Sequence, residues 1–452
     1  IGILLFALAR RDGLPSRTCW VLAATPALCG NFLWLGLIGM EHLLFVMLSL
    51  ASIYFWFETS LSHVRSAVVA GFAIGLVAIT RPEAIVFGPL LVSFSLLKIR
   101  RSIADVVIAM GIWSAFVGIL LGTNLYTSNS LLPATLKGRS WLYFHTSGGP
   151  HTVHSITRFL GAWIQRLPRQ FSCHFVQQIS SVNQIDNLFA AAGFAIAAIA
   201  LIGCYPLISQ TSLRIRFLIL WASVHFCIYL VAFPTGGHGG RYQPMTLLLL
   251  FPALFLGVSR IFELVFVGHQ RWATNATVSV LIVAGAAALK TWRTVAIDGI
   301  GHINSTHGMA ALWLKSHVSP TAKIAAFDIG RISYDWARGI TDLGGLVDPS
   351  YIPYLVHGQV PEYLEAKRIR YLVLPSQGIE DFGFANIDVF NMKRVAEYCS
   401  PSEPWLLGYR YTINATQCQE IYLLDSQLGA RKSNASDIPL TIGRSEKQSV
   451  KK

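Results

Sequence analysis

The stretch Thr80-Arg81-Pro82-Glu83 separates two apolar runs, residues 67–79 and residues 84–97. Charge at or near a bilayer costs free energy, so a cation and an anion in such a place indicate a functional role. Pro82 has no backbone N–H and disfavours the helical conformation at Arg81. We therefore predict a turn at a membrane face, where one short helix ends, the chain reverses, and a second helix returns.

The composition agrees with a membrane protein. The 452 residues are 53% hydrophobic and only 13% charged, with a mean hydropathy of +0.50. Apolar runs of about 15–22 residues recur, and this length is enough to cross a hydrocarbon core. The formal net charge of +13 comes mostly from short loops and the C-terminal end, so it does not indicate a nucleic-acid partner.

Hydrophobic run length predicts an α-helical polytopic membrane protein with about nine full membrane segments after a partial first one. The segments are expected at residues 1–9, 18–38, 41–57, 67–80, 84–98, 103–122, 188–208, 217–233, 244–262 and 274–290. Basic residues cluster in alternate loops, which the positive-inside rule assigns to the cytoplasm. These residues are Arg10, Arg11, His63, Arg65, Lys98, Arg100, Arg101, Arg214, Arg216, His269 and Arg271.

Three units follow from these segments. Residues 1–292 form the multi-pass domain, with a long extracytoplasmic loop at 123–187 in which residues 156–167 are expected to form an interfacial helix. Residues 293–425 are expected to form a small extracytoplasmic α/β domain, and the polar residues 426–452 a disordered tail. In the α/β domain we predict helices at 309–317 and 361–367 and strands at 323–327, 371–374 and 420–424.

The cysteines and histidines do not predict a metal site. None of the seven cysteines forms a pair with metal-site spacing. Cys399 and Cys418 lie in the polar C-terminal region and could form a disulfide if that region is outside the cytoplasm, which the sequence leaves open. His145, His151 and His154 are irregularly spaced, with no carboxylate nearby.

Four clusters of polar residues fall on the predicted extracytoplasmic side. They are residues 39–42, 80–83, 131–139 and 238–244. Together they could line one cavity, where Arg81, Lys137 and Arg241 would suit the phosphate of a lipid-linked substrate.

Each of these clusters also has a purely structural interpretation. Glu41 could simply end a helix at the water interface, and Arg81 with Glu83 could be an ion pair that holds the turn. Lys137 could be a solvated loop residue, and His238, which stands among glycines, could belong to a flexible turn.

The four clusters and a stretch at residues 327–351 occur along the chain in the same order as similar motifs in bacterial GT-C-type membrane glycosyltransferases. The chain resembles these enzymes over about residues 30–425. The closest group includes mycobacterial terminal arabinofuranosyltransferases and related enzymes that use polyprenyl-phosphate sugars, mannosyltransferase-like ones included. The matching stretches are GME at 39–41, TRPE at 80–83, LLPATLKGR at 131–139, HGGRYQP at 238–244 and FDIGRISYDWARGITDLGGLVDPSY at 327–351. The chain departs from the pattern at Ala134, where asparagine is usual, and at His42, where threonine is common.

The resemblance implies an enzyme of the bacterial inner membrane and cell envelope. It would move a hexosyl or pentosyl group from a polyprenyl-phosphate donor to a glycan, lipid or protein acceptor outside the cytoplasm, with no cofactor apart from the donor. The family's catalytic base is an aspartate in the first extracytoplasmic loop. That loop is expected to precede Ile1, so the catalytic residue is unknown.

The resemblance also implies roles for residues of this chain. Arg81 and Lys137 would bind the phosphate, and Arg241 and Tyr242 the phosphate or the sugar. Glu83 would orient Arg81, Glu41 would contact the sugar or support the site, and His238 would complete the substrate-binding set.

Two other functions use the same features. A transporter or flippase of lipid-linked or anionic solutes would also need broken helices and charges, but no inverted repeat is evident and the α/β domain would stay unexplained. A non-catalytic membrane scaffold, with an outer domain that binds a partner, is the other alternative.

Overall fold

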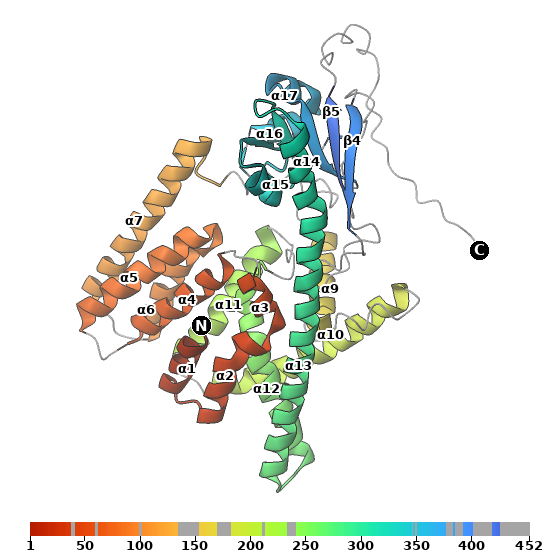
Figure 1. The fold of residues 1–452 in the computed structure, drawn as a ribbon. Coiled ribbons are helices and arrows are strands. Elements are labelled where there is room, and N and C mark those ends of the chain that lie inside the picture. The colour runs from red at the N-terminus through yellow and green to blue at the C-terminus, as the bar shows by residue number, and fades with distance from the viewer. Residues whose placement is uncertain are drawn as a thin grey trace.

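Helices dominate the computed structural model, and a small sheet lies towards its C-terminal end (Figure 1). The structure describes residues 1–37, 41–58, 62–98, 102–133, 153–169, 182–209, 213–232, 241–345, 347–348, 350–376, 383–384, 392–400 and 418–424.

The first part of the chain is a bundle of helices. They are α1 (Gly2–Arg11), α2 (Ser16–Leu28), α3 (Gly30–Leu37), α4 (His42–Trp56), α5 (His63–Thr80), the 3₁₀-helix η1 (Pro82–Val86), α6 (Phe87–Lys98), α7 (Ile103–Ser128), α9 (Val153–Arg169), α10 (Val182–Ser209), α11 (Leu213–Ala232), α12 (Pro244–Val265) and α13 (Gln270–Ile303). Leu50, Trp56, Phe87 and Trp221 are fully buried in its core.

Six of the helices in the described residues are long and apolar enough to cross a membrane. They are His63–Thr80, Ile103–Ser128, Ala190–Ser209, Leu213–Ala232, Pro244–Val265 and the run Arg271–His317. Two apolar helices are shorter, His42–Trp56 and Pro82–Leu97. The chain is therefore a multi-pass membrane protein, although the predicted number of about nine segments is not confirmed.

One predicted segment, residues 18–38, is two helices in the structure. The chain becomes extended at Cys29, between α2 and α3. Pro26 lies in the last turn of α2 and Gly30 opens α3, and both residue types weaken a continuous helix. Hydropathy did not reveal this break because both halves are apolar.

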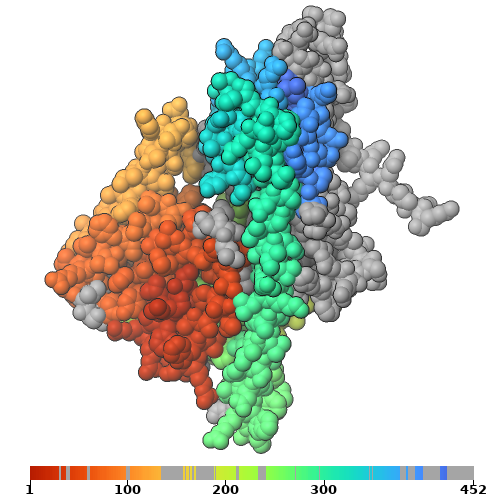
Figure 2. Space-filling model, viewed as in Figure 1, coloured from red at the N-terminus to blue at the C-terminus, as the bar shows by residue number. Residues whose placement is uncertain are grey.

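Helix α13 extends far beyond the predicted segment 274–290. It continues through a π-helical turn, η4 (Asn304–Gly308), directly into α14 (Met309–His317). The helix therefore runs through the domain boundary predicted at residues 292/293, and the division into domains stays a prediction. Figure 1 shows this rod running from the bundle to the sheet, and in Figure 2 it forms a column on the molecular surface. Hydropathy marks only the apolar part of a helix, whereas the backbone hydrogen bonds continue through polar residues.

The C-terminal elements form a five-stranded sheet with helices on both faces. They are β1 (Ile324–Ala326), α15 (Ile329–Trp336), β2 (Ile340–Asp342), α16 (Tyr351–Val356), α17 (Val360–Ala366), β3 (Tyr371–Pro375), β4 (Met392–Cys399) and β5 (Cys418–Leu424). The strand order is β2-β1-β3-β5-β4, in which β1 is parallel to β2 and β3, and β5 is antiparallel to β3 and β4. In register, Ile324 faces both Ile340 and Tyr371.

The side chains of β3 alternate between the two faces of the sheet, as a strand requires. Leu372 and Leu374 pack with residues of α16 and α17, and Val373 packs with residues of α14 and α15. The predicted strands at 323–327, 371–374 and 420–424 and helices at 309–317 and 361–367 are confirmed. Sequence reasoning missed β2, β4, α15 and α16.

The predicted helix at residues 156–167 is confirmed as part of α9, but its apolar stripe packs against protein. The ring centroids of Phe159 and Trp163 lie 5.7 and 5.3 Å from that of Phe226 in α11, and Leu167 is buried. An amphipathic pattern marks a buried stripe without saying whether lipid or protein covers it.

Several loops that were predicted on the cytoplasmic side meet at one end of the bundle. The Arg214 guanidinium donates to Asp12 Oδ1 at 3.3 Å and to the carbonyl oxygen of Phe57 at 2.6 Å. Arg11 forms an ion pair with Glu58 at 3.3 Å. These contacts join the loops that follow α1 and α4 and precede α11, which agrees with their assignment to one side.

Cys399 and Cys418 form a disulfide between the paired ends of β4 and β5, the pairing that the sequence left open. Within the described residues, Glu397 lies close enough to these two sulfurs to suggest a metal site. The disulfide consumes both thiolates, so this cluster is no metal site.

Helices α10 and α12 approach each other through glycine. A Cβ atom added to Gly203 would meet the carbonyl oxygen of Ala253, and one added to Gly257 would lie 2.0 Å from the carbonyl oxygen of Ile199. Small residues of this kind let membrane helices pack backbone to backbone.

We predict that Gly257→Ala destabilises the protein by about 1–3 kcal/mol, because the new methyl group must push α10 and α12 apart. Thermal unfolding in detergent measures this. Gly111→Ala on α7 is the matched control, since a Cβ atom there meets nothing within 4 Å. Equal unfolding temperatures for the two variants would contradict the close packing.

We also predict that digestion without reductant releases peptides joined through Cys399 and Cys418. Mass spectrometry of the digest identifies the joined peptides, and treatment with a reductant before digestion must separate them. Alkylation of both cysteines in untreated protein would rule out the disulfide.

Candidate functional site

The predicted turn at residues 80–83 is present. Helix α5 ends at Thr80, Arg81 is extended with φ −150° and ψ 132°, and η1 begins at Pro82. Proline suits the first position of a helix and keeps the residue before it extended. The local sequence thus turns the Arg81 side chain out of α5, while the residues that surround it come from distant parts of the chain.

Three protein groups bind the Arg81 guanidinium. Its Nε donates to Glu83 Oε1 at 2.5 Å, its Nη1 to Glu41 Oε1 at 3.2 Å, and its Nη2 to the hydroxyl of Tyr229 at 2.7 Å. Glu41 precedes α4 and Tyr229 lies near the end of α11. One cation therefore joins three helical elements.

Tyr229 closes this network. Its hydroxyl accepts from Arg81 and donates to Glu83 Oε1 at 2.7 Å. His225, one turn earlier in α11, is fully buried, with Nε2 3.6 Å from Glu83 Oε1, which is beyond ordinary hydrogen-bond distance. Glu83 thus meets a guanidinium, a phenol and an imidazole.

Aromatic rings cover the guanidinium. The Cζ atom of Arg81 lies 5.7 Å from the ring centroid of Phe45 and 5.8 Å from that of Tyr242. The Tyr242 ring stacks on Tyr229 at 5.6 Å, and Arg241 Cζ lies 5.1 Å from the same Tyr242 ring. A cation over an aromatic face is attracted to the ring electrons.

We call this group of residues the Arg81 cluster. It comprises Glu41, Arg81, Glu83, His225, Tyr229, Arg241 and Tyr242.

Exposure divides the cluster into a buried centre and a reachable rim. The side chain of Arg81 is 5% exposed and that of Glu83 10%, whereas that of Glu41 is 39% exposed. Arg241 is half-buried. A ligand would therefore meet the Glu41 carboxylate and the Arg241 guanidinium before it meets Arg81.

The structure brings together five of the seven residues that the sequence nominated as substrate-binding. They are Glu41, Arg81, Glu83, Arg241 and Tyr242. Lys137 and His238 lie outside the described residues. The same holds for His145 and His151, and the disordered tail predicted at 426–452.

Sequence reasoning missed His225 and Tyr229. Both lie in an apolar helix, four residues apart and so on one face of α11. Two polar aromatic residues with this spacing inside a membrane-length helix could have been used to predict a functional site on that face of the helix. His42 is a further buried neighbour, with Nε2 4.0 Å from Glu41 Oε1.

The cluster can both donate hydrogen bonds to a polar ligand and accept hydrogen bonds from it. The cluster holds two guanidinium groups and two carboxylates, so its formal charges balance when His225 is neutral. The carboxylate of Glu41 can accept hydrogen bonds from hydroxyl groups, and the guanidinium of Arg241 can donate to phosphate oxygens.

Comparisons with known proteins give limited similarity. A family model described as a domain of unknown function (DUF8728) matches residues 294–422. No curated protein matches the sequence.

Three solved structures from Archaeoglobus fulgidus resemble the chain. The first is the archaeal oligosaccharyltransferase AglB in complex with an inhibitory peptide and a dolichol-phosphate, with 12% identity over 88% of this chain and a TM-score of 0.45. The others are the oligosaccharyltransferase with Zn and sulfate, at 14% identity over 83% of this chain with a TM-score of 0.42, and in the apo form, at 12% over 82% with a TM-score of 0.40. The chain spans 61%, 54% and 57% of their respective lengths.

We predict that Arg81→Ala destabilises the protein by about 3–5 kcal/mol, because it leaves the buried Glu83 carboxylate without its cation. Thermal unfolding in detergent measures the loss. Arg260→Ala is the control, since Arg260 and its partner Glu263 are exposed and such pairs contribute about 1 kcal/mol or less. Similar unfolding temperatures for both variants would show that the cluster does not hold the bundle together.

Proposed function

We propose that the chain is an integral membrane glycosyltransferase of the GT-C type. It moves a hexosyl or pentosyl group from a polyprenyl-phosphate donor to a glycan, lipid or protein acceptor on the extracytoplasmic side of a bacterial inner membrane. The observation that carries the proposal is the Arg81 cluster, in which a reachable carboxylate and a reachable guanidinium lie on one buried, ion-paired centre.

The two reachable groups match the two polar parts of the donor: the carboxylate of Glu41 suits the sugar, and the guanidinium of Arg241 suits the phosphate. When the sugar transfers, the oxygen of the acceptor hydroxyl bonds to the anomeric carbon and its proton passes to a base. The bond between that carbon and the phosphate oxygen breaks, and the prenyl phosphate leaves with the bonding electrons. A cation beside that oxygen stabilises the charge that develops on it. We assign this role to Arg241, together with Lys137, and assign sugar hydroxyl contacts to Glu41 and Tyr242.

Arg81 has a different part in the proposal from the one that the sequence suggested. Three of its nitrogens already donate to protein groups, and its side chain is almost completely buried. Its main role is therefore to position Glu41 and the rings of Tyr229 and Tyr242, with Glu83 in turn orienting Arg81. His238 is kept as a further contact of the substrate.

The extracytoplasmic placement has two supports. Disulfides persist in oxidising compartments, and Cys399 and Cys418 are bonded. The basic loops that meet around Asp12 and Arg214 belong to the end of the bundle that the positive-inside rule assigns to the cytoplasm. We therefore propose that residues 1–292 form the membrane domain and 293–425 an extracytoplasmic domain.

We predict that Arg241→Gln lowers transfer from radiolabelled polyprenyl-phospho-sugars about 100-fold, since a stabilising donor at the leaving oxygen is lost. The assay uses membranes that contain the protein, with pentosyl and hexosyl donors tested in parallel. Arg338→Gln is the matched control, because Arg338 is an exposed arginine that lies over the ring of Trp336 in the C-terminal region.

Two outcomes would contradict the proposal. Unchanged transfer by Arg241→Gln would remove Arg241 from the phosphate site. Movement of labelled donor across sealed vesicles by the wild-type protein, without transfer to any acceptor, would favour a flippase instead.

A further inference from the structure

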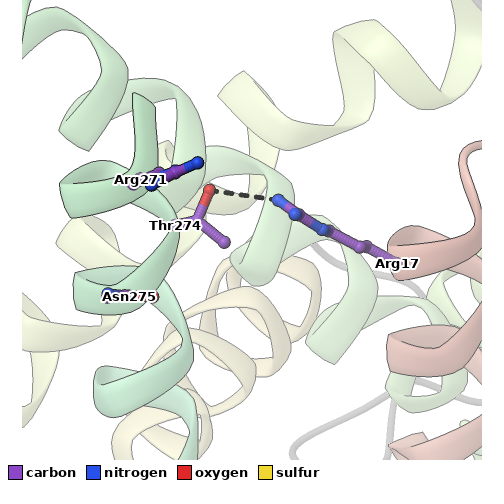
Figure 3. Close-up of a pocket in the computed structure, with 4 residues that line it drawn as sticks. All are labelled: Arg17, Arg271, Thr274 and Asn275. Carbon is purple, nitrogen blue, oxygen red and sulfur yellow. Dashed lines mark hydrogen bonds between the residues drawn. The ribbon is translucent and has the colours of Figure 1, made fainter. Parts of the chain in front are cut away.

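A second polar site lies at the other end of helix α12 from the Arg81 cluster. It is a pocket lined by Arg17, Arg271, Thr274 and Asn275. Figure 3 shows Arg17 reaching from α2 towards Thr274 on α13, with a hydrogen bond of 3.4 Å to its Oγ1 atom, and Arg271 one turn away on the same helix. Two arginines from helices far apart in sequence thus lie around one hollow.

This pocket is well separated from the Arg81 cluster. Arg241 and Tyr242 precede α12 and Arg271 follows it, and α12 has 22 residues. A helix of this length spans about 33 Å, close to the thickness of a hydrocarbon core. The two sites therefore belong to opposite membrane faces, and the pocket lies at the end where the basic loops meet.

The charge of the pocket favours an anion. Arg17 and Arg271 are both exposed, and no ion pair joins either of them to an acidic residue in the described part of the chain. Thr274 and Asn275 add neutral hydrogen-bonding groups. Guanidinium groups that converge in this way suit the oxygens of a phosphate.

Exposed aromatic and apolar residues place the pocket at the level of lipid headgroups. Trp20 lies one turn after Arg17, and Trp272 follows Arg271, and each is 66% exposed. Val265 and Val267, in the segment that joins α12 to α13, are also exposed. Tryptophan is enriched where a membrane protein passes from hydrocarbon to headgroups, and exposed valines there can enter the lipid.

We propose that this pocket binds the phosphate headgroup of an anionic phospholipid from the leaflet on that side of the membrane. Arg17 and Arg271 donate to the phosphate oxygens, Thr274 and Asn275 contact the polar part of the headgroup, and Trp20 and Trp272 lie against the lipid around it. The site is independent of sugar transfer, and it ties α2 to α13, the helix that continues to the sheet.

The test is lipid retention by the whole protein. Protein purified in mild detergent is exchanged into micelles that contain phosphatidylglycerol or phosphatidylcholine, and native mass spectrometry counts the bound lipid. We expect the wild type to retain phosphatidylglycerol in preference to phosphatidylcholine. Arg17→Gln and Arg271→Gln should each weaken that retention about fivefold, since a basic residue near an anionic lipid surface contributes about that factor.

A matched control separates the pocket from general positive charge. Arg293→Gln removes an exposed arginine from the same helix, and the 22 positions between Arg271 and Arg293 correspond to about 33 Å. It should leave retention unchanged, and so should inorganic phosphate added as a competitor. Arg17→Lys keeps the charge but loses the planar fork, and should lie between the wild type and Arg17→Gln.

Three results would overturn the proposal. The first is equal retention of the two lipids by the wild type. The second is unchanged retention in the double variant of Arg17→Gln and Arg271→Gln, whose unfolding temperature shows whether it is folded. The third is displacement of the lipid by millimolar phosphate, which would indicate a site for the free anion. Each of these results is independent of the transfer assay, which tests the glycosyltransferase proposal separately.

Discussion

The buried guanidinium of Arg81 is the interaction on which the arrangement of the bundle depends. A charge can be taken out of water only when it is paired and hydrogen-bonded, so the chain must bring partners to it. Those partners come from the residue before α4, from η1 and from α11, and the Tyr242 ring that precedes α12 covers it. Satisfying one cation therefore sets how four elements meet.

The same requirement explains why the cluster has a rim. Glu83 is held inside by Arg81 and Tyr229, whereas Glu41 reaches the cation from a helix end and keeps much of its surface exposed. Arg241 lies over the outer ring of the stack and is half-buried. A buried ion pair with one carboxylate and one guanidinium on its outer side can therefore keep its own structure whether or not a polar ligand is bound.

The two ends of the bundle carry different chemistry, and α13 connects one of them to the sheet. At one end, Asp12, Glu58 and Arg214 join loops, and exposed tryptophans flank the pocket of Arg17 and Arg271. At the other end, the Arg81 cluster lies beside the start of α12. Helix α13 continues into α14 and reaches the sheet (Figure 1). A continuous helix is a stiff connection, so the position of the sheet relative to the bundle follows from the packing of α13.

The sequence by itself determined the features that depend on neighbouring residues. Pro82 dictates the extended Arg81 and the turn around it, apolar run length identifies the membrane helices, and short apolar runs identify β1, β3 and β5, because each of these is a property of local backbone and burial. Sequence reasoning missed the edge strand β4 because its exposed side chains do not alternate clearly. It missed β2 because a strand of three residues has too few positions to show a pattern. Only the tertiary structure decided that Tyr229 and Glu41 share Arg81, that Cys399 bonds to Cys418, and that Arg17 faces α13. These contacts join residues far apart in the chain, and their free energy depends on distance and burial that no local pattern contains.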